Sequence, residues 1–242
     1  MLKPQDRLIV ALDVPSAAKA RQLVQSIGDA ATTYKIGKQL FTAEGPQLVR
    51  ELIASGRKVF LDLKFHDIPN TVAGAVTSAA ELGVSMLTVH ASGGSKMLKA
   101  AAEAAAQSSS KPMVLGVTVL TSMNEADLEE LGITAGVGGQ VLRLAGLALA
   151  AGCGGLVASA QEARQLRNEL GEGFALVTPG VRPAGAAVGD QARIVTPAQA
   201  IEAGATYLVV GRPILDAPDP ARTAADIVSE IEQAALQGGA RL

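Results

Sequence analysis

The sequence predicts an α/β protein with a single domain, a (β/α)8 barrel of the TIM type, and three observations lead to this prediction. The chain has 242 residues, a length at which single α/β barrels are common. One unit recurs along it: a short apolar run, a polar or glycine-containing turn, and a helical segment rich in Ala and Leu. Eight such units predict parallel strands joined by right-handed crossovers, and that number favours a closed barrel over an open sheet.

The strands are the eight apolar runs, which we place at residues 8–12, 33–36, 59–63, 86–89, 113–120, 155–158, 175–178 and 207–210. Helices are predicted between them, the clearest at 16–27, 44–55 and 69–82, each followed by glycine, which commonly ends helices. Ser16 is a candidate N-cap, because its hydroxyl can accept a backbone N–H of the first turn. No linker or change of composition divides the chain, so we expect one domain over residues 1–242.

Composition excludes several classes of protein. Hydrophobic residues make up 48% of the chain and charged residues 18%, which allows a sizeable core and argues against disorder. The net charge of -2 provides no basic surplus for nucleic acid or an anionic membrane surface. The single cysteine, Cys153, rules out an internal disulfide, and no apolar run reaches the ~20 residues of a membrane span. We therefore expect a cytoplasmic protein with no membrane partner.

Polar side chains follow the carboxyl ends of the predicted strands, the end at which this fold carries its active sites. In chain order they are Asp13, Lys35, Asp62 with Lys64, His90, Thr121 with Ser122, Thr178-Pro179-Gly180, and Gly211-Arg212. A random scatter of charge would not follow the strand ends in this way. The pattern therefore predicts a catalytic site at one rim of the barrel.

The third strand and the turn after it carry the densest cluster of charge. Asp62 and Lys64 are two residues apart, so both side chains should point to the same face of the strand, and Asp67 follows after a short turn. Opposite charges beside a lysine favour its ammonium form, which suits a proton donor better than a Schiff-base nucleophile. Taken alone, the pattern fits a surface salt-bridge cluster equally well.

The loops after the seventh and eighth strands predict a phosphate site, because this fold often binds phosphate there. They contain Arg182 and Arg212, the latter beside Gly211, where the backbone can approach a ligand closely. The loop at about 181–193 is rich in Gly and Ala and long enough to act as a lid over the phosphate, with Gln191 as a polar contact. The alternative is a surface loop with solvated arginines.

The motifs at these strand ends resemble those of a known family, the orotidine 5'-phosphate decarboxylases of the bacterial type. The resemblance rests on the ten residues 62–71, which read DLKFHDIPNT, and runs in the same order from about residue 8 to 214. Further segments that fit are residues 12–13, 34–37, 88–91, 120–122, 178–183, 190–193 and 210–213. The signature over 62–71 is highly specific, whereas a bare Asp-x-Lys-x-x-Asp is not.

The resemblance implies decarboxylation of orotidine 5'-phosphate to uridine 5'-phosphate, the last step of de novo UMP biosynthesis, without a cofactor or a metal. It implies that Lys64 protonates C6 of the pyrimidine and that Lys35, Asp62, Lys64 and Asp67 form an alternating network of charges. It also implies a homodimer in which Asp67 and Thr71 reach the neighbouring site. The implied substrate contacts are Asp13 and Lys35 at the ribose, Thr121 and Ser122 near the base, Arg182, Gln191, Gly211 and Arg212 at the phosphate, and in addition Asp62, Lys64, Asp67, Ile68, Thr71 and Pro179.

Two alternatives stay open. Magnesium-dependent sugar-phosphate enzymes share the Asp-x-Lys-x-x-Asp pattern but have a carboxylate where this chain has Lys35, whose positive charge repels the metal. A barrel that binds a phosphorylated ligand without catalysis is the second. Neither His66 nor His90 has metal-ligand spacing with the cysteine, so no zinc site is predicted. We expect His66 to orient its neighbours in the turn, whereas for His90 a structural role and a ligand contact both stay open.

Overall fold

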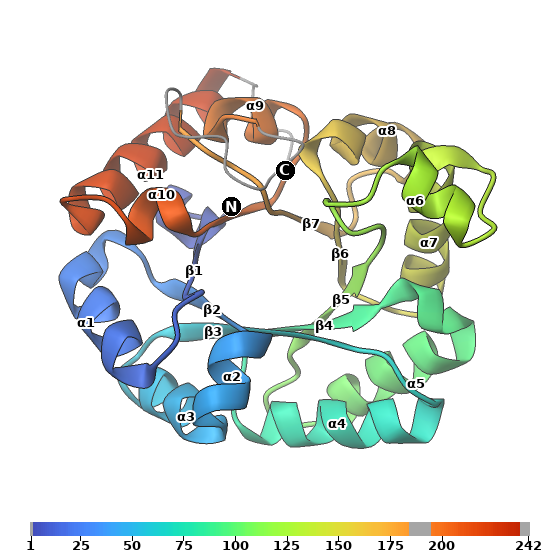
Figure 1. Ribbon diagram of the computed structural model, residues 1–242, viewed down its shortest axis with the longest axis horizontal. Helices are drawn as coiled ribbons and strands as arrows, with labels where there is room; N and C mark the ends of the chain where they lie inside the picture. The colour runs from blue at the N-terminus through green and yellow to red at the C-terminus, as the bar shows by residue number, and fades with distance from the viewer. Residues whose placement is uncertain (1, 184–194, 238–242) are drawn as a thin grey trace.

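The computed structural model describes residues 2–183 and 195–237, and its sheet is a closed barrel of parallel strands in the order β1 to β8 (Figure 1). The barrel closes where β1 pairs with β8, with Leu8 opposite Leu208. This confirms the predicted (β/α)8 fold. The strands are β1 Leu8–Ala11, β2 Thr33–Gly37, β3 Lys58–Phe65, β4 Met86–His90, β5 Met113–Val117, β6 Gly155–Val157, β7 Ala175–Thr178 and β8 Tyr207–Val210.

Helices form an outer ring around the barrel (Figure 1). They are α1 Ala17–Ile27, α2 Lys38–Glu44, α3 Pro46–Ala54, α4 Pro69–Glu81, α5 Gly94–Gln107, α6 Glu125–Glu130, α7 Gly136–Ala150, α8 Ala160–Leu170, α9 Pro197–Glu202, α10 Arg212–Leu215 and α11 Pro220–Gln237, with 3-10 turns η1 Pro4–Arg7, η2 Gly28–Ala30 and η3 Ala91–Gly93. None of the helices in the described ranges is both long enough and apolar enough to cross a bilayer.

The predicted caps hold for α1, but other predicted boundaries were wrong. The Ser16 hydroxyl accepts the Lys19 N–H at 3.3 Å, and Gly28 follows the helix at φ +58. The predicted helix at 44–55 corresponds to α3, which Pro46 begins after Gly45 at φ +65, and the short helix α2 before it was not predicted. The fifth strand ends at Val117 rather than at residue 120, and the Thr118 hydroxyl donates to the Val157 carbonyl where the chain leaves the sheet.

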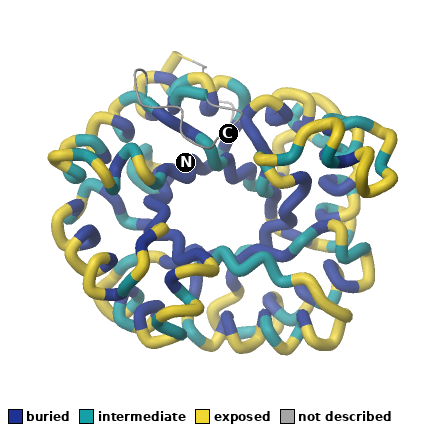
Figure 2. The backbone as a smooth tube through the Cα atoms, in the orientation of Figure 1, coloured by how far each residue is buried: buried dark blue, intermediate teal, exposed yellow. Residues whose placement is uncertain are grey.

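Alternation of side chains along the strands produces two separate apolar clusters. One fills the barrel interior and comprises Ile9, Ala11, Phe60, Met86, Leu115, Val177, Tyr207 and Val209. The larger one lies between the strands and the helices, and the buried backbone of the barrel wall stands out in Figure 2 from the exposed outer faces of the helices. Ala11, Phe60, Val177 and Val209 also line the cavity described below, so the interior cluster forms the apolar floor of that cavity.

Candidate active site

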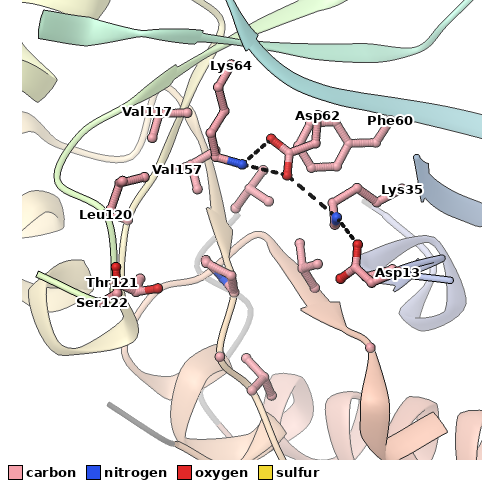
Figure 3. A pocket seen from close by; sticks show the side chains of 18 of the residues that line it. Asp13, Lys35, Phe60, Asp62, Lys64, Val117, Leu120, Thr121, Ser122 and Val157 are labelled. Carbon is pink, nitrogen blue, oxygen red and sulfur yellow. Dashed lines mark hydrogen bonds and ion pairs between the residues drawn. The ribbon is translucent and has the colours of Figure 1, made fainter. Parts of the chain in front are cut away.

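A cavity of about 520 Å³ opens at the carboxyl ends of the strands (Figure 3). Its polar wall contains the side chains Asp13, Lys35, Asp62, Lys64, Thr121, Ser122, Arg182 and Arg212. Its apolar wall includes Val117 and Val157, which Figure 3 shows on the Lys64 side. The cavity therefore has an apolar part directly beside charged groups, a combination that suits a ligand with both apolar and charged parts.

The backbone of β3 breaks its regular pairing at the site. Leu61 lies opposite Leu87 and Phe65 opposite Val89, so four steps along β3 match two steps along β4. Within this bulge Lys64 adopts φ +53, a left-handed conformation that a lysine rarely takes. Simple alternation therefore does not explain why Asp62 and Lys64 face each other. The bulge bends the chain so that the Lys64 side chain returns toward Asp62.

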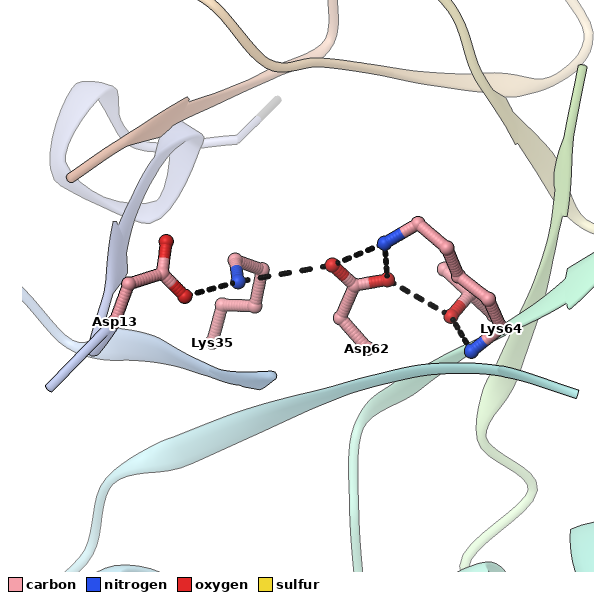
Figure 4. Close-up of polar contacts among 5 residues, drawn as sticks. Asp13, Lys35, Asp62 and Lys64 are labelled. Carbon is pink, nitrogen blue, oxygen red and sulfur yellow. Dashed lines mark hydrogen bonds and ion pairs between the residues drawn. The ribbon is translucent and has the colours of Figure 1, made fainter. Parts of the chain in front are cut away.

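Four side chains of alternating charge form a row along one wall of the cavity (Figure 4). The Lys35 ammonium lies 2.8 Å from Asp13 Oδ1 and 3.6 Å from Asp62 Oδ2. The Lys64 ammonium donates to both oxygens of Asp62, at 2.7 and 2.8 Å. The side chains of Lys35 and Asp62 are only 10% and 12% exposed, so little water screens the middle of this row, whereas Asp13 at its end is 56% exposed.

Across the cavity, two arginines supply positive charge. Arg182 follows β7 and is buried, and Arg212 is the first residue of α10, directly after Gly211. Pro179 and Gly211 line the same region. Arg182 and Arg212 follow β7 and β8, which lie across the closed barrel from β3, the strand that carries Lys64. One side of the cavity therefore carries arginines, and the other carries the ion pairs of Asp62. An anionic group of a ligand would find its charge complement on the side of the two arginines.

Comparison with known proteins gives the family of the chain. Residues 6–227 match the family described as "Orotidine 5'-phosphate decarboxylase / HUMPS family". The chain belongs to this family. Among curated relatives, the orotidine 5'-phosphate decarboxylase of Halorhodospira halophila is 56% identical over 228 residues, covering 94% of this chain and 97% of the relative. That of Idiomarina loihiensis is 53% identical over 225 residues, covering 93% and 97%. The crystal structure of orotidine 5'-phosphate decarboxylase from Lactobacillus acidophilus superimposes with a TM-score of 0.84 at 37% identity, covering 93% of this chain and 99% of that one.

Three of the residues that the family resemblance singled out lie away from the cavity of this chain. Asp67, Ile68 and Thr71 are exposed at the start of α4, and the Ile68 side chain stands 67% exposed. The Asp67 carboxylate accepts the Ile68 backbone N–H at 2.6 Å and is not among the cavity-lining groups. Gln191 and most of the loop at about 181–193 lie outside the described residues. In this chain the row of charges thus runs Asp13, Lys35, Asp62, Lys64.

The Asp62 carboxyl is held ionised by its neighbours. Burial by itself raises its pKa, but the charges of Lys35 and Lys64 and the hydrogen bonds from Lys64 and Thr88 lower it, and the net pKa lies below the ordinary value. An ionised Asp62 in turn stabilises both ammonium groups. The arrangement therefore places fixed charges beside the apolar part of the cavity, where they can stabilise charge that develops on a bound ligand.

Thr88 was missed by the sequence analysis. It lies in β4, fully buried, and its hydroxyl contacts both Asp62 and the backbone of Lys64. The signal was a hydroxyl residue in an otherwise apolar run, two positions before His90, but threonine is common in strands and carries no chemistry by itself.

The two histidines lie beside each other at the rim, with ring centroids 5.5 Å apart. Burial lowers the pKa of His90, and the nearby positive charges of His66, Lys38 and Lys64 lower it further, while Asp62 opposes them. Within residues 2–183 and 195–237, no three His, Cys, Asp or Glu side chains group together as a set that could hold a metal ion.

Proposed function

We propose that this protein decarboxylates orotidine 5'-phosphate to uridine 5'-phosphate, the last step of de novo UMP biosynthesis, with Lys64 as the proton donor. One observation carries the proposal: Asp62 holds the Lys64 ammonium beside the apolar part of the cavity, and Arg182 and Arg212 line the other side of the same cavity. The phosphate binds the arginines, with Gly211 alongside. The pyrimidine then occupies the apolar end, near Val117, Thr121 and Ser122.

The chemistry requires electrostatic help rather than an electron sink. When the bond between C6 and the carboxylate breaks, its electron pair stays on C6 in the plane of the ring, carbon dioxide leaves, and a proton from Lys64 Nζ moves to C6. An ammonium ~4 Å from the developing negative charge contributes on the order of 4 kcal/mol at an effective dielectric constant of ~20. Because demanding reactions need a barrier reduction of ~20 kcal/mol, the remaining contribution comes from the other charges and from phosphate binding energy.

Lys35 favours this reaction over that of the magnesium-dependent sugar-phosphate enzymes. Its ammonium lies between the carboxylates of Asp13 and Asp62, at 2.8 and 3.6 Å. A divalent cation shared by those two carboxylates would have to occupy the same space, against a fixed positive charge. In the proposed reaction Lys35 and Asp13 instead bind the ribose hydroxyls, and Lys35 helps to keep Asp62 ionised.

We further propose a homodimer in which Asp67, Ile68 and Thr71 contribute to the site of the neighbouring subunit. Their exposure at the start of α4 leaves them available for such a contact, and the apolar Ile68 side chain gains from being covered. The loop at about 181–193, with Gln191, acts as the lid over the phosphate, and the protein works in the cytoplasm as one domain. Sedimentation that finds only monomer at micromolar concentration contradicts the shared site.

The function is tested by following the absorbance of orotidine 5'-phosphate at 280–300 nm with purified protein in EDTA. We expect metal-independent conversion to uridine 5'-phosphate, with release of one carbon dioxide per product. Absence of turnover in EDTA, together with magnesium-dependent activity on a sugar phosphate, would assign the protein to the other branch of the family. Tight binding of the substrate with no turnover under either condition would indicate a non-catalytic binding protein.

A further inference from the structure

Thr88 lies directly behind the row of charges without lining the cavity. Its neighbours Leu87 and Val89 belong to the outer apolar cluster and Met86 belongs to the interior cluster, so Thr88 also points into the barrel. The residue is completely buried. A hydroxyl in this position needs hydrogen-bond partners, because an unpaired polar group in an apolar interior is costly.

The Thr88 hydroxyl has two partners, and their chemistry fixes the direction of each bond. The Lys64 backbone N–H can only donate, and it donates to Thr88 Oγ1 at 2.9 Å. The Asp62 carboxylate can only accept, so the Thr88 O–H donates to Asp62 Oδ1 at 3.0 Å. One side chain therefore connects the backbone of the proposed proton donor to the carboxylate that holds its ammonium.

The hydrogen bonds to the Thr88 hydroxyl fix the backbone conformation of Lys64 and the orientation of the Asp62 carboxylate. Lys64 lies in the bulge where the pairing of β3 with β4 is interrupted, and its backbone has φ +53. A lysine stays in such a conformation only where surrounding contacts hold it there. Asp62 receives bonds from Lys64 on both oxygens, and the bond from Thr88 on Oδ1 sets the rotation of the carboxylate plane.

We propose that Thr88 is a positioning residue for the decarboxylation, which holds the left-handed backbone at Lys64 and the orientation of Asp62 through a single hydroxyl. The inference rests on the proposed function, because it assigns Thr88 a part in that reaction. It also predicts a property of the resting protein, the protonation of Asp62, that can be measured whether or not orotidine 5'-phosphate is the substrate.

The first test replaces the hydroxyl by a methyl group of nearly the same size, in Thr88→Val. Since Thr88 does not line the cavity, we expect KM for orotidine 5'-phosphate to stay within about threefold, while kcat falls by roughly 10- to 100-fold, the range for a hydrogen bond to a charged group. Thr88→Ser keeps the hydroxyl and should retain most of the wild-type kcat. If Thr88→Val does not fold, Thr88→Ala is compared with Thr88→Ser, because these two differ by the hydroxyl alone.

The matched control is Thr206→Val, at the opposite end of the barrel. The Thr206 hydroxyl also accepts a strand backbone N–H, from Leu176 at 3.0 Å, and contacts a charged group, Arg167, at 3.1 Å. Its loss should lower the melting temperature by an amount similar to that of Thr88→Val and leave kcat unchanged. This comparison separates positioning from general destabilisation.

The second test is independent of activity and follows the Asp62 carboxyl by ¹³C NMR during an acid titration, with Asp62→Asn for assignment. The hydrogen bond from Thr88 is one of the contacts that lower the pKa of Asp62, so its loss in Thr88→Val should move the titration to higher pH. The acid limb of the kcat profile should move in the same direction, because the ionised carboxylate is the active form.

An unchanged Asp62 titration in Thr88→Val overturns the proposal, as does a Thr88→Ser variant as impaired as Thr88→Val. Wild-type protein that lacks turnover counts against the proposed function, and the titration still decides the role of Thr88.

Discussion

The two ends of the barrel both hold buried cations, but different partners surround them. At the carboxyl ends of the strands, Lys35 and Lys64 form direct ion pairs with the carboxylates of Asp13 and Asp62 along one wall of an open cavity. At the amino ends, Arg7 donates to the carbonyls of Ala205 and Thr206 at 2.8 and 3.1 Å, directly before β8.

Arg167 makes the same kind of contact at the amino ends. It donates to the carbonyls of Gly204 and Phe174, each at 3.0 Å, and its guanidinium lies 4.4 Å from the centre of the Phe174 ring. These carbonyls belong to the turns that lead into β7 and β8, so Arg167 connects two strand starts. Burial lowers the pKa of both Arg7 and Arg167, and the exposed carboxylate of Glu172, 3.3 Å from the Arg167 guanidinium, opposes that shift in Arg167.

The difference distinguishes a structural cation from one that can do chemistry. Backbone carbonyls cannot move or change their charge, so an arginine bound to them only fixes the turns that supply them. Charged side chains that face a cavity create an electric field at the position of a bound substrate. Their own protonation can in turn change when a charged ligand binds. Burial and positive charge alone therefore do not identify a site.

The largest effect is expected at Lys64. Lys64→Ala removes both the proton donor and the positive charge beside C6, so kcat should fall by at least about 10⁴-fold, measured by the absorbance assay. The control is Lys58→Ala, at the amino end of the same strand, where the ammonium forms an exposed ion pair with Asp6 at 3.2 Å. Its kcat should equal that of the wild type. Activity of Lys64→Ala within tenfold of the wild type would contradict the proposed mechanism.

The next effect, on stability, is expected at Arg167. Arg167→Met keeps the apolar stem but deprives the carbonyls of Gly204 and Phe174 of this donor, so the free energy of unfolding should fall by about 2–4 kcal/mol. Urea unfolding measures this loss, and kcat at 25 °C should change by less than about twofold. Arg21→Met is the control, because its exposed ion pair with Glu51 contributes less than ~1 kcal/mol. Equal losses in the two variants would show that the buried contacts add nothing.

A smaller effect on substrate recognition is expected at Arg212. Arg212→Ala should lower kcat/KM for orotidine 5'-phosphate by roughly 10- to 100-fold, because one charged contact to the phosphate is lost. With orotidine, which has no phosphate, the variant and the wild type should react equally. Arg222→Ala, in α11, serves as the control, because it also removes an arginine but one whose ion pair with Asp226 is exposed. A loss with orotidine as large as that with the phosphate ester would exclude a phosphate contact.

The smallest effect is the pH dependence that His90 adds to stability. Since its folded pKa lies below the ordinary 6.5, the unfolded chain binds more protons between the two values, and stability should fall as the pH drops through that window. His90→Gln cannot take up this proton, so its free energy of unfolding should depend less on pH just below 6.5. Urea unfolding of both proteins between pH 5 and 8 gives the two slopes. Identical slopes would mean that His90 does not titrate differently on folding.

Much of the architecture could be predicted from the sequence, because the repeating unit is local. Apolar runs, turns and helix stops such as Gly28 are set by residues close in the chain, and eight βα units leave few ways to bury their strands other than a closed barrel. The same regularity places the residues that follow each strand at one rim, which is why Asp13, Lys35 and Arg212 could be named without coordinates. The short helix α2 before Gly45 was missed, since a helix of 7 residues with Leu40 as its one buried residue gives little periodic signal.

The geometry inside the cavity was decided by the tertiary structure. Asp62 and Lys64 do meet, but through a bulge and a left-handed residue rather than through strand alternation. That conformation depends on Thr88, which is 24 positions from Lys64 in the sequence and reaches it only because β4 pairs beside β3. By itself the sequence determined the fold and which chemical groups reach the rim, because local patterns set where each strand ends. Only the folded barrel decided which of those groups touch, because register and backbone conformation at the bulge depend on hydrogen bonds between distant segments.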